Sequence, residues 1–559
     1  RLDQGRDFQA ETTGDKEFMK LIDEILSRDP RNVLHYSAKL GKWILIPLNR
    51  VQAMKPGDLY FHDIQAPLDI TNPEVQKYLE RTTLELLNYV NGFRVDCAQG
   101  LILKGEKGEP GFYDYWAKEY PAGWQERDMS QRLQQELWPG LIPVLRETYL
   151  KMHSEAKGNE KLQLLLFAEA FWLFDRLDTY GFDLIFQLMP LILLGIKGNV
   201  PALREYMETR QGEHERRVHA SATHDDQMKD IVQGTFLQHP HLSASKLITL
   251  MFDIATLAGV PMFPYEELID GYLRAETGIK PLTRYEGYQR LEIRRAGRLV
   301  LPLALAPLFR KGGLTMFRPN NPNILAFARS LGDQHVIRVS NYSDREESDT
   351  IDLADVREAW KLDAQRGHYY ALIDHVSGDG YLRTGEDLLN NKLYVRLPAH
   401  GSHLFMVQEI KGKTEEEIKI LDNMLSAAQG RALPLRDICT LLRDFDLRIH
   451  FPVEGTVGKA VGIKFLLDHL SVRAGLVSSP VALRHASAAR EWGVLMHITS
   501  LPEGDFGPEA YRFVDILHNM SASWWQVLPI TPAEGSPFSS FSVFAIQLRF
   551  LSPALLVQK

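Results

Sequence analysis

The chain has 559 residues, of which 45% are hydrophobic and 24% are charged, a balance typical of globular proteins. This length exceeds one compact core and predicts two to four domains. The net charge of −8 offers no basic field for nucleic acid or for an acidic membrane surface, and no apolar run reaches the length of a membrane span.

The chain has only two cysteines, Cys97 and Cys439, so we do not expect a disulfide framework. Sparse cysteine fits a reducing compartment and predicts a cytoplasmic protein. The chain begins at Arg1 and not at a methionine, so we expect it to be processed or to be a piece of a longer protein.

Strands and helices alternate between residues 66 and 268, after a mixed and polar first part at 1–65. This alternation predicts a parallel sheet with helices outside it. The expected strands lie within 91–97, 162–172, 181–188, 217–227 and 259–268, and the expected helices lie near 71–90, 141–155, 200–210 and 246–259.

From about residue 315 the pattern changes to short strands between turn residues, as in HVIRVSNYS and SHLFMVQ. Such runs predict a small antiparallel β domain that ends near residue 408. A charged helical segment follows and continues to about 490. The last residues return to an α/β pattern, in which WGVLMHI and WWQVLPI are apolar strands separated by an amphipathic stretch.

Three carboxylates, Asp96, Glu169 and Asp225, fall at the ends of expected parallel strands, where a parallel barrel collects its chemistry. Glycoside chemistry needs a carboxylate that attacks the anomeric carbon and a second carboxyl group that carries a proton. The apolar neighbours of Glu169 would favour its protonated form. Arg94 lies on the same face as Asp96 and would keep it ionised. His224 is a donor for a sugar hydroxyl.

Each of these features taken alone is more often structural. An Arg-x-Asp pair on a strand is usually a plain ion pair, and a glutamate after an apolar run usually marks the place where a strand meets solvent. The His-Asp-Asp run at 224–226 is usually a polar loop or a helix cap. The three together, in this order and on this architecture, are much harder to explain as an accident.

The motifs GFRVD (92–96), FAEAFW (167–172) and THDD (223–226) resemble three ordered signature regions of glycoside hydrolase family 13, the α-amylase family. PLDITNPEVQKYLE (67–80) is similar to the segment before the fourth barrel strand of that family. The resemblance covers roughly residues 60–408, and the β domain is similar to the family's C-terminal sandwich.

The resemblance implies a role for each matching residue. Asp96 falls on the nucleophile and Arg94 on the arginine that orients it. Glu169 falls on the general acid/base. His224 and Asp225 fall on the pair that contacts the sugar and stabilises the transition state. No metal site and no cofactor are expected.

This chain departs from the family 13 pattern in three ways. Thr223 stands where Asn is common, and CAQGL follows the proposed nucleophile in place of the usual acceptor-side sequence. The first signature region is not found before residue 60, so the barrel is expected to lack its first strands.

A second resemblance lies at the other end of the chain. EWGVLMHITSLP (491–502) and SWWQVLPITPAEGSPFSSFSVFA (523–545) look like the start of glycoside hydrolase family 77, the 4-α-glucanotransferases. Phe538 stands where that family usually has Tyr, and IQL (546–548) replaces Gly-Asn-Pro. The catalytic carboxylates of that family would lie beyond Lys559.

The two resemblances imply an α/β multidomain chain. The expected parts are an inserted-domain-like region at 1–65, a family 13-like (β/α)8-type barrel segment at 66–315, an antiparallel β-sandwich at 316–408, a helical connector at 409–490, and the beginning of a second (β/α)8 barrel at 491–559. The expected substrate is an α-1,4-glucan or malto-oligosaccharide. Neither nucleic acid nor a membrane is an expected partner, and the oligomeric state is left open.

Three functions remain open at this point. The first is a 4-α-glucanotransferase that works by retaining double displacement. The second is an amylase- or debranching-type hydrolase, with water as the acceptor. The third is an inactive or glucan-binding fragment. The products formed from maltotriose separate the first two, because a transferase makes longer oligosaccharides and a hydrolase makes only shorter sugars.

Overall fold

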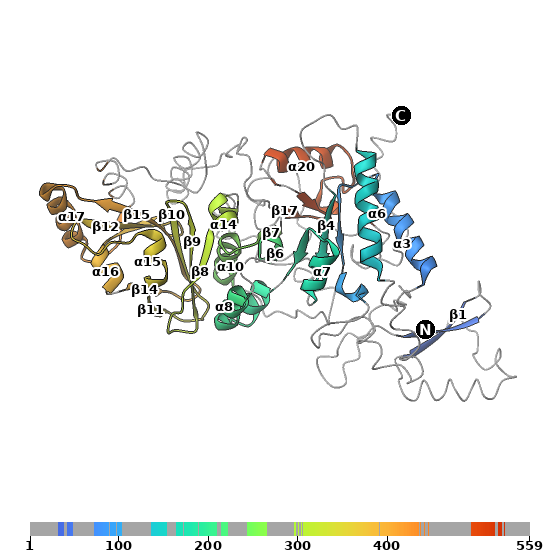
Figure 1. The fold of residues 1–559 in the computed structure, drawn as a ribbon, viewed down its shortest axis with the longest axis horizontal. Coiled ribbons are helices and arrows are strands. Elements are labelled where there is room, and N and C mark those ends of the chain that lie inside the picture. Colours follow the sequence, from blue (N-terminus) through green and yellow to red (C-terminus); the bar gives the residue numbers. More distant parts are fainter. Residues whose placement is uncertain are drawn as a thin grey trace. The chain divides into compact units, whose positions relative to one another are not determined.

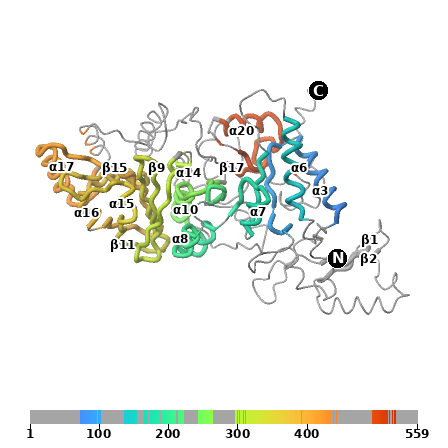
Figure 2. The backbone as a smooth tube through the Cα atoms, in the orientation of Figure 1, coloured from blue at the N-terminus to red at the C-terminus, as the bar shows by residue number. Residues whose placement is uncertain are grey.

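The computed structural model of the chain is drawn in Figure 1, and Figure 2 traces its backbone. Its contacts divide it into two compact units, of which the first holds 1–93, 99–164 and 228–238 and the second holds the remainder. No helix of the described residues is long and apolar enough to cross a membrane. The structure describes residues 32–37 and 42–47 (backbone), 72–88, 90–96, 98–102, 136–153, 164–170, 173–187, 189–209, 214–221, 243–264, 296–297, 300, 303–304, 306–390, 392–434, 437, 441, 445, 493–519, 522, 524–527 and 530.

The first unit contains a hairpin and two packed helices. Strand β1 (Asn32–Ser37) pairs antiparallel with β2 (Lys42–Pro47). Helix α3 (Pro73–Leu86) starts after Asn72, whose side chain accepts a hydrogen bond from a backbone N–H of the first turn. Helix α6 (Leu137–Met152) packs on α3. The helices expected near 71–90 and 141–155 are therefore confirmed.

A seven-stranded sheet with the order β18-β17-β7-β6-β5-β4-β3 is the main feature before the β domain. Strands β4 to β7 run parallel to one another. The alternation of strands and helices predicted from the sequence is confirmed. The strands are β3 (Gly92–Val95), β4 (Leu165–Glu169), β5 (Leu184–Phe186), β6 (Arg217–Ala220) and β7 (Val260–Pro264), and the helices between them include α7 (Phe174–Tyr180), the π-helix η3 (Leu191–Ile196), α8 (Val200–Thr209) and α10 (Ala244–Thr256).

Two strands from the end of the chain continue this sheet. Strand β17 (Gly493–Leu495), helix α20 (Pro508–Asn519) and strand β18 (Trp524–Gln526) form a β-α-β unit whose strands are parallel. The sequence predicts the start of a second barrel here, whereas in the structure β17 pairs in parallel with β7. An open strand edge presents unpaired backbone groups to any strand that reaches it. Within the described residues, both segments therefore share one sheet, and Figure 1 draws β17 beside β7.

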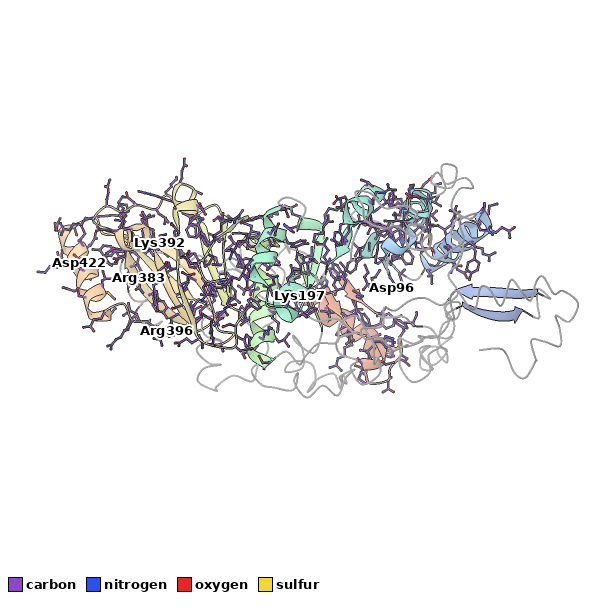
Figure 3. The ribbon with its side chains drawn as sticks, turned by 90° about the horizontal axis from the view of Figure 1, so that it is seen from below. Asp96, Lys197, Arg383, Lys392, Arg396 and Asp422 are labelled. Atoms are coloured by element: carbon purple, nitrogen blue, oxygen red, sulfur yellow. The ribbon has the colours of Figure 1, made fainter. Side chains whose placement is uncertain are left out.

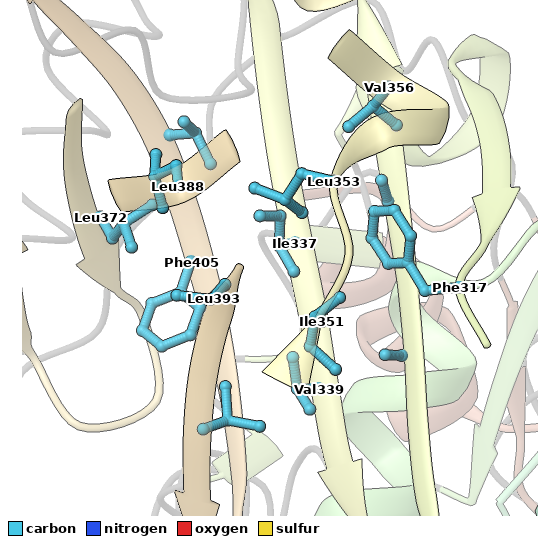
Figure 4. Close-up of a cluster of buried hydrophobic side chains, with 14 of the residues drawn as sticks. Phe317, Ile337, Val339, Ile351, Leu353, Val356, Leu372, Leu388, Leu393 and Phe405 are labelled. Carbon is cyan, nitrogen blue, oxygen red and sulfur yellow. The ribbon is translucent and has the colours of Figure 1, made fainter. Parts of the chain in front are cut away.

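The β domain is built on a second seven-stranded sheet, which is antiparallel and has the order β16-β13-β12-β15-β10-β9-β8. A two-stranded sheet of β11 and β14 lies over it, and side chains from both enclose a hydrophobic core (Figure 4). The β-sandwich predicted for this region is confirmed. Its strands are β8 (Gly313–Met316), β9 (Ile324–Leu331), β10 (Gln334–Asn341), β11 (Glu347–Ile351), β12 (His368–Asp374), β13 (Asp379–Thr384), β14 (Leu393–Leu397), β15 (Ser402–Lys411) and β16 (Leu433–Pro434).

Further helices among the described residues pack within the β domain. Helices α15 (Ala354–Trp360) and α16 (Gly385–Asn390) contribute buried side chains to the core shown in Figure 4. Helix α17 (Glu415–Ala428) starts with a capping box formed by Thr414 and Glu417 and buries Leu421 in a separate cluster with residues of β12, β13 and β15. The first part of the expected connector at 409–490 thus packs on the β domain.

Helix α10 contacts elements of both sheets. It packs on β7 of the parallel sheet and on β10 of the antiparallel sheet. Ser243 caps its start by accepting a hydrogen bond from the backbone N–H of Lys246 at 3.2 Å. The buried residues on α10 include Thr249 and Asp253, whose side chains form hydrogen bonds with His400 and Ser340 and so tie this helix to its neighbours. The hydroxyl of Thr256 instead donates to the carbonyl of Phe252 within the helix.

Asp374 ends β12 as a fully buried carboxylate. Its two oxygens accept hydrogen bonds from Nδ1 of His403 at 2.8 Å and from the backbone N–H groups of Leu404, Val376 and Ser377 at 2.9, 3.0 and 3.2 Å. Burial by itself raises the pKa of Asp374. The hydrogen bond and the charge of His403, with the backbone donors, outweigh burial and lower the pKa to about 2.

We expect this carboxylate to stabilise the β domain in a pH-dependent way. Because the pKa in the folded state lies below the ordinary value of 3.8, the stabilisation is complete above about pH 4 and is lost as the pH falls toward 2. The loss should be about 2 kcal/mol in the free energy of unfolding. Urea unfolding followed from pH 7 to pH 2 measures it, and Asp374→Asn should remove most of this pH dependence. Asp355→Asn, at an exposed position of α15, is the matched control and should keep it.

Candidate active site

One guanidinium joins two of the predicted site residues. Arg94 lies in β3, and its Nη1 donates to Oδ1 of Asp96, directly after the strand. Its Nη2 lies 2.5 Å from Oε1 of Glu169, the last residue of β4. Strands β3 and β4 are neighbours in the sheet, so their ends bring the arginine and both carboxylates together. The side chain of Asp96 is labelled in Figure 3.

The sequence predicts the pair of Arg94 with Asp96 but not the second bond to Glu169. The guanidinium of Arg94 can bind two carboxylates at once, because each of its two terminal nitrogens donates to an oxygen of a different carboxylate. Both carboxylates therefore lie within reach of one small region at the strand ends. A retaining glycosidase pair, with carboxyl groups about 5–5.5 Å apart, is compatible with such a bridge.

Glu169 is held deep in the sheet. Only 8% of its side chain is exposed, and Phe167, two residues before it on the same face of β4, packs edge-to-face on Phe186 with ring centroids 5.9 Å apart. Burial favours the protonated acid, whereas the guanidinium of Arg94 favours the carboxylate. Arg94 thus opposes the effect of the apolar residues near Glu169, which the sequence predicts to favour its protonated form. Two of these residues, Phe171 and Trp172, lie outside the described residues.

Asp96 has a different setting, because 75% of its side chain is exposed. Water can reach this side chain, whose Oδ1 accepts a hydrogen bond from the guanidinium of Arg94. A charged, accessible carboxylate next to a buried one gives two carboxyl groups in unlike environments, which is the arrangement that separates acid from nucleophile.

The remaining predicted residues, His224 and Asp225 with Thr223 before them, lie outside the described residues, which stop at Ser221 after β6. Their assignment to the site remains a prediction. Among the described residues, no group of three or more His, Cys, Asp or Glu side chains is placed to hold a metal ion.

The ends of other parallel strands also carry buried polar side chains, which the sequence does not single out. Ser221 follows β6, His497 follows β17 and Gln526 ends β18, with exposed fractions of 0%, 0% and 8%. Nδ1 of His497 lies 2.8 Å from the hydroxyl of Thr499. The signal available in the sequence is a lone polar residue within an apolar run, as in WWQVLP.

The model of the glycoside hydrolase family 77, described as 4-alpha-glucanotransferase, matches residues 496–559. The 4-alpha-glucanotransferase of Aquifex aeolicus is 45% identical over 75 residues, which cover 12% of this chain and 16% of the relative. The chloroplastic/amyloplastic 4-alpha-glucanotransferase of Solanum tuberosum is 42% identical over 105 residues, 17% of each chain. The chain thus spans only a small part of the length of these relatives.

Among solved structures, an Anoxybacillus alpha-amylase aligns with 62% of this chain and 66% of its own, at 14% identity and a TM-score of 0.37. Residues 496–559 of this chain carry the sequence pattern of the 4-alpha-glucanotransferase family.

Proposed function

We propose that the chain is an α-glucan-active enzyme, a 4-α-glucanotransferase that moves α-1,4-glucan segments by retaining double displacement. The observation that supports it best is the guanidinium of Arg94, which bridges Asp96 and Glu169 at neighbouring strand ends. The match of 496–559 to 4-alpha-glucanotransferases points to the same chemistry. The substrate would be an α-1,4-glucan or a malto-oligosaccharide.

In the first step, a carboxylate oxygen of Asp96 attacks the anomeric carbon, and the bond to the glycosidic oxygen breaks. Glu169 donates its proton to that oxygen, so the leaving sugar departs as a neutral alcohol. Arg94 acts as a positioning residue that orients both carboxyl groups. Its positive charge also offsets the negative charge that Glu169 acquires when it gives up the proton.

In the second step, the hydroxyl of an acceptor sugar attacks the anomeric carbon of the glycosyl-enzyme from the side that the leaving sugar vacated, opposite the bond to Asp96. Glu169, now a carboxylate, takes the proton of that hydroxyl, and the ester bond to Asp96 breaks. Two inversions at the anomeric carbon retain its configuration. His224 and Asp225 would contact the sugar in both steps, as the resemblance to family 13 implies.

One observation favours hydrolysis as the second candidate. Three-quarters of the Asp96 side chain is exposed, so water can reach the ester that forms there. A transferase must exclude water or hold an acceptor sugar more effectively than water competes for the intermediate. The same residues would then catalyse an amylase- or debranching-type reaction.

Incubation of the 559-residue chain with maltotriose separates these candidates. The transferase should yield maltotetraose and longer oligosaccharides together with glucose and maltose. Formation of glucose and maltose alone would assign the hydrolase. Binding of maltotriose without any product would leave only the glucan-binding fragment, and Asp96→Asn with unchanged turnover would remove this site from the mechanism.

The division of the chain and its compartment belong to this proposal. We assign the catalytic carboxylates to the 66–315 segment, the sandwich to 316–408 and the family 77-like segment to 491–559, with 1–65 as an insertion and 409–490 as a connector. Two cysteines in 559 residues suit a cytoplasmic location.

A further inference from the structure

Strand β18 turns two side chains toward one face of the parallel sheet. Trp524 pairs with Gly493 and Gln526 pairs with Leu495 in the register of β18 with β17. Successive side chains of a strand alternate, so Trp524 and Gln526 share one face and Trp525 takes the other. Trp525 packs on Phe513 of α20 with ring centroids 4.9 Å apart, which identifies its face as the outer, helix-covered one.

Trp524 contacts a residue of a distant strand on the inner face of the sheet. Its ring lies 6.0 Å from that of Phe167 in β4, although β18 and β4 are separated by β17, β7, β6 and β5 in the sheet order. The sheet therefore curls until these two rings meet across its inner face. Phe167 and Glu169 share a face of β4 in the same way as Trp524 and Gln526 share a face of β18.

Gln526 and Glu169 thus occupy equivalent places, each two residues beyond an inner aromatic ring. In a curled parallel sheet, side chains at the same height form a layer, and the layer nearest the carboxyl ends faces the active site. Gln526 lies in β18 as Glu169 lies in β4, at the last residue of the strand. Both therefore face the same inner space at the carboxyl ends of the strands.

The side chain of Gln526 has an unused acceptor. Only 8% of the residue is exposed, and its Oε1 has no hydrogen-bond partner within the described part of the chain. Buried polar atoms are nearly always hydrogen-bonded, so an unpaired one is available to accept a hydrogen bond from a ligand. A glutamine amide both donates and accepts, which suits the hydroxyl groups of a sugar.

The local packing holds this strand end in place. A Cβ on Gly493 would lie 1.8 Å from the ring of Trp524, so the indole rests directly on the glycine backbone. Trp525 donates its Nε1–H to the carbonyl of Met496 at 2.8 Å and fixes the opposite face. The side chains of Trp524 and Trp525 therefore hold β18 on both of its faces and fix the direction in which Gln526 points.

We propose that Gln526 binds a hydroxyl group of the glucan at the Arg94–Asp96–Glu169 site, so that the family 77-like segment supplies a substrate-positioning residue to the family 13-like half. This inference rests on the proposed function of that site. The sugar-binding site would then be formed jointly by β18 of the family 77-like segment and by the strand ends of the family 13-like half.

The first test is a pair of substitutions at Gln526. Gln526→Leu keeps the size and removes the amide, and it should raise KM and the Kd for maltotriose roughly tenfold while changing kcat less. Gln526→Glu places a second carboxylate opposite Glu169 and should shift the pH–rate profile upward. Gln408→Leu and Gln408→Glu, on β15 of the β domain, are the matched controls and should change neither quantity.

An unchanged KM and Kd in Gln526→Leu would overturn the inference, even in a fully active enzyme. So would an unchanged pH profile in Gln526→Glu. If Gln526→Leu does not fold, the pH profile of Gln526→Glu decides alone, because a purely structural glutamine would not move the ionisation of Glu169.

The second test needs no activity. Phe263 and Val494 are register partners of β7 and β17, and adjacent strands lie about 4.7–4.9 Å apart, a distance that a disulfide can bridge. In a Cys97→Ser/Cys439→Ser background, Phe263→Cys with Val494→Cys should cross-link under oxidation. Phe263→Cys with Leu495→Cys, whose side chains take opposite faces, should not.

Absence of the in-register cross-link would overturn the inference whatever the activity. A cross-link in a protein that neither binds nor converts maltotriose would overturn the proposed function and, with it, the role of Gln526. A cross-link with normal turnover and a normal KM in Gln526→Leu would overturn the inference alone.

Discussion

Glutamine in place of Glu169 is expected to lower kcat on malto-oligosaccharides by about 10²–10⁴-fold, the usual contribution of a positioned proton donor. The amide keeps the shape of the side chain and a hydrogen-bond acceptor for Arg94, but it carries no proton to the glycosidic oxygen. The loss should therefore appear in kcat more than in the Kd for substrate. Steady-state kinetics together with calorimetric binding of maltotriose separates the two.

An activated substrate sharpens this test. Fluoride leaves without needing a proton, so maltosyl fluoride should still form the glycosyl-enzyme in Glu169→Gln. Asp96→Asn lacks the attacking carboxylate and should form none, which intact-protein mass spectrometry detects directly. Glu346→Gln, at an exposed partner of Arg396, is the matched control and should retain normal turnover.

The opposite pattern would reverse the assignment of roles. If Asp96→Asn accumulates a glycosyl-enzyme and Glu169→Gln does not, the buried residue is the nucleophile and the exposed one is the proton donor. The ion pair of Arg94 with Glu169 favours the charged form of a residue that must be protonated to donate a proton in the first step.

Local features of the sequence predict the elements well. Asn72 and Pro73 mark the start of α3, and the apolar run before Glu169 predicts β4, because capping and hydrophobic pattern act within a few residues. The placement of Arg94 and Asp96 on one side of a strand end also follows from the two-residue period of a strand.

Contacts between distant segments could not be predicted in the same way. The bond from Arg94 to Glu169 depends on which strand neighbours β3 and at what height, and no local pattern encodes that register. The pairing of β17 with β7 uses backbone groups, which every strand presents whatever its sequence. Gln526 enters the candidate site only through that pairing.

Loss of the Asp253 carboxylate on α10 is expected to destabilise the protein strongly. Asp253 and Arg338 of β10 are both fully buried, with Nε of the arginine 2.6 Å from Oδ1 of the aspartate. The same Oδ1 accepts from the hydroxyl of Ser340 at 2.8 Å, and Oδ2 accepts from that of Tyr342 at 2.5 Å. Burial first, and then the charge of Asp253, raise the pKa of Tyr342, so its hydroxyl remains a donor.

Asp253→Ala should lower the free energy of unfolding by about 3–5 kcal/mol, because it leaves a buried guanidinium without its counter-charge. Two hydroxyl donors lose their acceptor at the same time. Since α10 packs on both β7 and β10, weakening this cluster should also uncouple the two sheets. Urea unfolding should then show separate transitions, and hydrogen exchange in α10 and β10 should accelerate.

Removal of both charges tests the cause. Asp253→Leu combined with Arg338→Met replaces the buried pair with apolar side chains and should recover most of the stability lost in Asp253→Ala. Asp344→Ala, at a carboxylate that is 98% exposed beside His400, is the control and should have little effect. Equal losses in the single and the double variant would show that packing around α10, and not an uncompensated charge, sets the effect of Asp253.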